Sequence, residues 1–127
     1  MSTKEYSYQQ NLPIINVEVI GPKGSLQIRA LVDSGASISL FNAQIAEIIG
    51  IEFKKGKRVE LSGIGGKIRG YLHKIPILVN DKRFECKIVF SSEIFENVNL
   101  LGRGNFFLPF LITFNERDRK FFLQENR

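Results

Sequence analysis

Asp33 is the side chain best placed for chemistry, because it lies in the stretch Leu31-Val32-Asp33-Ser34-Gly35-Ala36. The two apolar residues before the acid are typical of the end of a buried strand. Gly35 lets the backbone turn sharply directly after the acid. A carboxylate held at a strand end against apolar residues is poorly solvated and suited to acid–base chemistry. The same stretch also fits a surface Asp-Ser-Gly turn, so other parts of the chain must decide between the two.

Two later stretches bear on that choice. Gly63-Ile64-Gly65-Gly66 precedes Lys67-Ile68, and four of the eight residues from 63 to 70 are glycine. So many glycines indicate close backbone approach or mobility, although an ordinary glycine-rich hairpin tip is the alternative. Val98-Asn99-Leu100-Leu101-Gly102-Arg103 is a short apolar strand ended by Gly-Arg.

In this order and spacing, the three stretches resemble the motifs of the retropepsin family, the retroviral-type aspartic proteases. These proteases carry two apolar residues before Asp-Thr/Ser-Gly-Ala, a glycine-rich flap tip, and a second apolar pair followed by Gly-Arg. The resemblance covers residues 12–115. It implies an all-β fold, a closed retropepsin-like barrel with one short helix, in which a single lobe is completed by homodimerisation. Ser37 stands where viral members often carry an acid, and the C-terminal end is longer, so the chain is more similar to cellular and bacterial members.

The resemblance also implies the roles of individual residues. Asp33, Ser34 and Gly35 would be catalytic, and the second carboxylate would be Asp33 of another copy, because the chain contains one Asp-Ser-Gly. The protein would then be an aspartic endopeptidase acting on peptide or unfolded protein. Gly102 and Arg103 would support the site, although the usual carboxylate partner of Arg103 is missing. The residues expected to contact substrate are Leu31, Ala36, Ser37, Ser62, Gly63, Ile64, Gly65, Val98 and Leu100.

The hydrophobic periodicity predicts short strands with turns at regular spacing, which is typical of a barrel-like fold. One short helix is expected between Asn42 and Gly50, with Ile45, Ile48 and Ile49 on one face. Pro76 predicts an edge or a bulge in a strand over residues 74–79. One helical turn is expected over residues 105–108.

Both ends of the chain carry further predictions. Residues 1–11 are a polar segment, either disordered or an edge strand, and residues 12–127 form the protease domain. The C-terminal residues Phe121, Phe122 and Leu123 form an apolar strand, which we expect to pair between subunits. The alternative is that this hairpin packs on its own barrel.

Composition excludes several other classes of protein. No apolar run approaches the ~20 residues of a membrane span, and no signal-peptide region is present, which predicts a cytoplasmic protein without membrane partners. Cys86 alternates with apolar residues and is expected to be a buried thiol, and no metal-ligand spacing occurs, so we expect no metal and no cofactor. The net charge is +5, but the basic clusters fall in predicted turns and strand ends, so we expect no nucleic-acid binding.

Two alternatives to a protease remain. The chain could be a catalytically weak retropepsin-fold module that binds peptides or dimerises, although such a module has no need of the intact Asp33-Ser34-Gly35. The net positive charge suggests a nucleic-acid-binding barrel, although no basic strand face with aromatic residues supports it.

Overall fold

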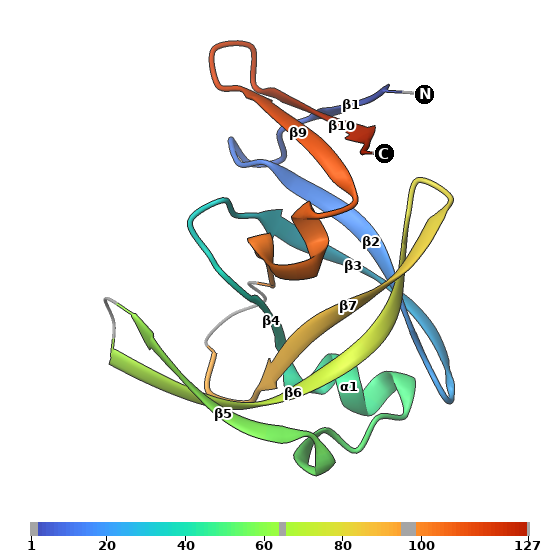
Figure 1. Cartoon of the computed structure of the whole chain (residues 1–127), viewed down its shortest axis with the longest axis vertical. Helices are drawn as coiled ribbons and strands as arrows, with labels where there is room; N and C mark the ends of the chain where they lie inside the picture. The colour runs from blue at the N-terminus through green and yellow to red at the C-terminus, as the bar shows by residue number, and fades with distance from the viewer. Residues whose placement is uncertain (1–2, 64–65, 95–98, 127) are drawn as a thin grey trace.

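The computed structural model describes residues 3–63, 66–94 and 99–126. This part of the chain folds mainly into strands, which form a seven-stranded sheet and a three-stranded sheet (Figure 1). The strands are β1 (Thr3–Ser7), β2 (Ile14–Gly21), β3 (Gly24–Val32), β4 (Ser39–Asn42), β5 (Lys57–Gly63), β6 (Gly66–Val79), β7 (Lys82–Ser91), β8 (Leu100–Leu101), β9 (Phe110–Asn115) and β10 (Lys120–Glu125). The helical elements are α1 (Ala43–Ile49), η1 (Phe53–Lys55) and η2 (Arg103–Phe107).

The larger sheet closes on itself. Its strands run in the order β2-β3-β8-β4-β7-β6-β5, and β2 pairs in addition with β6 through Glu18–Leu78 and Val19–Ile77. Six strands therefore form a closed barrel. Strand β5 pairs only with β6 among the described strands and is not part of the closed ring. The predicted all-β closed barrel is confirmed.

The alternating pattern of apolar residues correctly predicts the first hairpin. Ile15, Val17 and Val19 of β2 are almost fully buried, and β2 pairs with β3 along its whole length. Strand β6 is longer than predicted, because it continues from the glycine-rich stretch through Pro76 to Val79. Pro76 lies between Leu72, the last residue paired with β5, and Ile77, which pairs with β2. Its missing N–H therefore falls where one edge of β6 has no partner strand, as expected for proline.

Helix α1 begins and ends where predicted. The Asn42 side chain accepts a hydrogen bond from the Gln44 N–H at 2.9 Å, and Gly50 caps the C-terminal end. The prediction that Ile48 shares the buried face is wrong, because Ile48 is 61% exposed. Successive helical residues are about 100° apart, and the stripe formed by residues 43, 46 and 49 leaves position 48 on the solvent side.

The chain ends meet in the smaller sheet, whose order is β1-β10-β9 (Figure 1). Phe121 and Leu123 are almost fully buried within one chain, and Tyr6 of β1 stacks on Phe121 with ring centroids 5.0 Å apart. The N-terminal strand and the barrel core cover β10 within one chain, which supports the alternative that this hairpin packs on its own barrel. Pairing of the terminal strands between subunits stays a prediction. Residues 1–11 thus contain an edge strand, and a domain boundary at residue 12 stays a prediction.

Candidate active site

The carboxylate of Asp33 lies at the end of β3, between the buried barrel and the solvent. Val32 is almost fully buried, Asp33 is half-buried, and Ser34 and Gly35 are exposed. The Asp33 N–H donates to the Leu101 carbonyl at 2.9 Å. The Asp33 Oδ1 accepts a hydrogen bond from the Gly35 N–H, also at 2.9 Å. Strand pairing therefore fixes the backbone of the acid, and its own turn orients the carboxylate.

The chain turns at Gly35 as predicted, but glycine is favoured there by close contact rather than by the backbone conformation. Gly35 does not adopt a positive φ, so the turn itself does not need glycine. A Cβ atom at this position would lie 3.2 Å from Asp33 Oδ1. The glycine leaves room for the carboxylate to bond with the backbone of its own turn.

Three successive amides of the segment Gly102-Arg103-Gly104 hold the Asp33 turn and the start of β4. The Arg103 N–H donates to the Ala36 carbonyl at 2.9 Å, and the Gly104 N–H donates to the Ser37 carbonyl at 3.1 Å. A Cβ atom at residue 102 would lie 2.5 Å from the Ile38 carbonyl oxygen, so only glycine permits this approach. The two motifs, about 70 residues apart, are therefore one structural unit.

The third amide of that segment bonds to Ser39, which sequence reasoning gave no role. The buried Ser39 Oγ accepts from the Gly102 N–H at 3.1 Å and lies 3.9 Å from the Cys86 sulfur. Burial raises the pKa of the Cys86 thiol to about 11, so this thiol is neutral at physiological pH and unsuited to nucleophilic chemistry.

Asn99 is a second structural residue that sequence reasoning missed. Its Oδ1 accepts from the Asn42 N–H at 3.1 Å, and its Nδ2 donates to the Arg29 carbonyl at 3.1 Å. Its own carbonyl accepts from the Leu31 N–H at 2.8 Å. Asn99 is only 7% exposed, and a buried polar side chain needs such partners. The sequence feature that could have indicated this role is the presence of an asparagine within the apolar run before Gly102.

The structure brings several of the predicted substrate-contacting residues together. Leu31 and Leu100 are adjacent in the parallel β3–β8 pair, and both are half-buried beside Asp33. Ala36 is half-buried and Ser37 is exposed on the same turn. Val98 lies outside the described residues.

The predicted flap corresponds to the end of the β5–β6 hairpin. Ser62 is exposed, and Gly63 pairs with Gly66, so the strands extend further into this stretch than predicted. Ile64 and Gly65 lie outside the described residues. The hairpin and the loop between β3 and β4 project to the same side of the view in Figure 1.

The Arg103 backbone N–H bonds to the Asp33 turn, and the Arg103 side chain is exposed. Within residues 3–63, 66–94 and 99–126, no carboxylate pairs with the Arg103 guanidinium. The η2 turn that begins at Arg103 is irregular, because Asn105 has a φ of 66°, and it starts two residues earlier than the predicted helical turn. A bracing role for the Arg103 side chain stays a proposal.

The described residues contain no cluster of three or more His, Cys, Asp or Glu side chains arranged to hold a metal ion. Among these residues, no helix is both long and apolar enough to span a membrane.

Comparison with known families decides the class of this fold. A family model described as "Aspartyl protease" matches residues 15–92, which is more than half of the chain and includes the Asp33 turn. The chain belongs to the aspartyl protease family. A search of curated protein sequences finds no match.

Solved structures of this family agree with the assignment. The fold is similar to that of a retropepsin-like aspartic protease from Rickettsia conorii, with a TM-score of 0.72 and 14% identity over 97% of this chain and 99% of that one. It is also similar to the EIAV protease in complex with the inhibitor HBY-793, with a TM-score of 0.57 and 18% identity over 77% of this chain and 88% of that one. The predicted retropepsin-like fold is confirmed, and by TM-score the fold is more similar to that of the bacterial protein than to that of the viral one.

Proposed function

We propose that the protein is an aspartic endopeptidase whose active site combines Asp33 from two copies of the chain. The observation that carries the proposal is the half-buried Asp33 on a turn braced by the second motif, within an aspartyl protease fold. The chain contains a single Asp-Ser-Gly, so one copy supplies one of the two carboxylates that this chemistry requires. The exposed Ser34 and Gly35 leave the turn open to a partner.

Two carboxylates held together share one proton, because both cannot ionise at close range. The ionised member takes a proton from a water molecule, and the protonated member polarises the carbonyl of the scissile peptide. The water then attacks directly, without an acyl-enzyme. The pair titrates as one unit, so activity should follow a bell-shaped pH profile.

The partner surface that best fits this site follows from the free edge of β9. Strand β10 has a neighbour on each side within its own chain, whereas β9 pairs only with β10 among the described strands. The most exposed apolar side chains nearby are Leu108 at 69%, Leu111 at 57% and Phe114 at 38%. An unpaired edge with exposed apolar residues is suited to pairing with a second copy. Leu111 and Phe114 are three residues apart and therefore lie on opposite faces of the strand. We refer to the free edge of β9 together with Leu111 as the β9 surface.

The chain connects the Asp33 turn to β9 through η2. Element η2 begins at Arg103, whose N–H bonds to Ala36, and β9 follows η2 directly. Two-fold pairing of β9 with β9 would therefore bring the two Asp33 turns toward one axis, as an isologous interface requires. This proposal is an alternative to the terminal-strand interface expected from the sequence.

Substrate would bind in an extended form between the catalytic turn and the β5–β6 hairpin, by adding a strand to the hairpin. Leu31, Ala36 and Leu100 would line apolar side-chain pockets, and Ser37 and Ser62 would offer polar contacts. Gly63, Ile64, Gly65 and Val98 keep their expected substrate-binding roles as part of this proposal.

The decisive experiment compares cleavage of an unfolded protein by the native chain, Asp33→Asn and Asp81→Asn at several pH values. Asp81 lies in the exposed β6–β7 turn, so it undergoes the same chemical change away from the site. We expect Asp33→Asn to abolish cleavage while the fold is retained, and Asp81→Asn to cleave normally. Cleavage by Asp33→Asn would refute the assignment, and a native chain that binds peptide without cleaving it would indicate the binding module instead.

A further inference from the structure

The β5–β6 hairpin leaves the barrel at Tyr71. Strand β6 pairs with β7 from Tyr71, opposite Phe90, to Val79. Toward its N-terminal end, β6 pairs only with β5 among the described strands. A two-stranded ribbon has little stability of its own, so its last contacts with the barrel set its direction.

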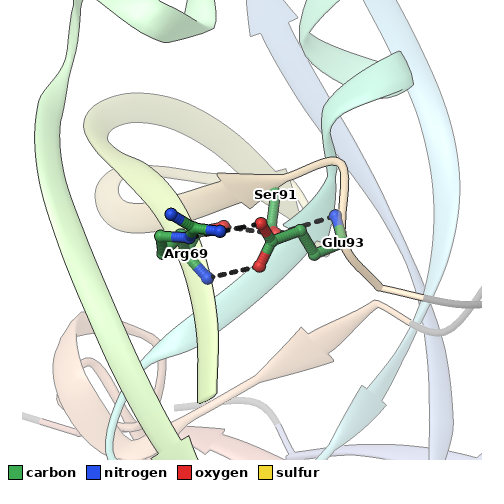
Figure 2. A network of polar contacts seen from close by, with 3 residues as sticks. All are labelled: Arg69, Ser91 and Glu93. Carbon is green, nitrogen blue, oxygen red and sulfur yellow. Dashed lines mark hydrogen bonds and ion pairs between the residues drawn. The ribbon is translucent and has the colours of Figure 1, made fainter.

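Those last contacts are made by side chains at the end of β7, as Figure 2 shows. The Arg69 N–H donates to Glu93 Oε1 at 2.8 Å, and the Ser91 Oγ donates to the Arg69 carbonyl at 2.6 Å. The Glu93 N–H donates to the Ser91 Oγ at 3.0 Å. The N–H and the carbonyl of Arg69 are therefore both hydrogen-bonded, to the side chains of Glu93 and Ser91 respectively. These two side chains extend the hydrogen bonding between β6 and β7 beyond the last paired backbone residues.

The main-chain bonds, and not the ion pair, give this network its strength. The Arg69 Nε and Glu93 Oε2 atoms are 3.5 Å apart, and the two side chains are 59% and 39% exposed. An ion pair this exposed contributes little. Ser91 is only 1% exposed, and its hydroxyl is held by the two hydrogen bonds described above.

We propose that Ser91 and Glu93 form a clasp that fixes the β5–β6 hairpin over the catalytic turn, which makes them positioning residues for substrate binding. The inference rests on the proposed peptidase function. Arg69 is three residues from Gly66, so the free end of the hairpin extends about 10 Å beyond the clasp. A small rotation at Arg69 is therefore amplified at the end that would bind the peptide backbone.

The chain offers a matched control on the same hairpin. Glu60 of β5 pairs with Lys67 of β6 at 3.4 Å, and both side chains are exposed. This ion pair joins the two strands of the ribbon to each other and does not reach the barrel. Its loss removes a comparable surface charge pair and leaves the clasp intact.

The experiment measures peptide-cleavage kinetics and amide hydrogen exchange for the native chain, Glu93→Ala, Glu93→Gln and Glu60→Ala. Loss of one solvent-exposed hydrogen bond predicts a rise in KM of about three- to tenfold for Glu93→Ala, with kcat nearly unchanged. The Arg69 amide should exchange faster in the same variant. Glu93→Gln keeps an acceptor oxygen and should restore part of both properties, and Glu60→Ala should match the native chain.

Two results would overturn the clasp. One is a Glu93→Ala variant with native KM, and the other is a Glu60→Ala variant that impairs KM equally. Failure of the proposed function gives a separate signal, because the native chain itself would not cleave. In that event the clasp would still be refuted if the Arg69 amide exchanged at the same rate in Glu93→Ala as in the native chain.

Discussion

Replacing Leu111 with alanine should weaken the dimer and lower specific activity at low protein concentration. Leu111 lies on the β9 surface and is 57% exposed in one chain, so its side chain has apolar area to bury against a partner. Less than half of Leu111 is covered within one chain, so the change removes few contacts of the folded chain. The free energy of unfolding of one copy should therefore stay near the native value, unlike that of a core variant.

The magnitude follows from that exposed fraction. Full burial of a leucine side chain is worth about 1.5–3 kcal/mol, so burying the exposed 57% of Leu111 is worth about 1–1.5 kcal/mol per copy. A two-fold dimer contains the residue twice, so the loss for the dimer is about 2–3 kcal/mol. Since 1.4 kcal/mol is tenfold in affinity, the dimer Kd should rise about 30- to 150-fold.

The assay is sedimentation equilibrium over a dilution series, together with cleavage of an unfolded protein at the same concentrations. The matched control is Ile48→Ala, because Ile48 is 61% exposed on the outer side of α1. We expect Ile48→Ala to dimerise and cleave as the native chain does. If Leu111→Ala keeps the native Kd, or if both variants weaken the dimer equally, the β9 surface is not the interface.

Two further predictions concern the interior of the site. Gly102→Ala should destabilise the fold by about 1–3 kcal/mol, because its Cβ would lie 2.5 Å from the Ile38 carbonyl, and urea unfolding with a native midpoint would contradict this. Cys86 should resist alkylation at pH 8, because a thiol with a pKa of about 11 is only about 0.1% ionised there. Its reaction with iodoacetamide should be fast only in denaturant, and fast labelling of the native chain would show that the thiol is accessible.

Several features of this protein were predictable from local sequence alone. The residues that lead into Asp33 predicted the strand end, because apolar residues with period two indicate a half-buried strand. The capping residues Asn42 and Gly50 predicted both ends of α1, because caps act within one helical turn. The order of three short motifs predicted the fold through their resemblance to the retropepsin family.

Only the tertiary structure decided which distant residues support the site and which surface is free. Ser39 and Asn99 acquire their roles from partners that lie tens of residues away, and no local pattern encodes such pairing. Phe121 was expected to lie in a strand that pairs between subunits, but β1 already covers it within one chain, because burial depends on which strand lies beside it. The free edge of β9 and the clasp at Arg69 exist for the same reason, since strand order and sheet ends are properties of the whole chain.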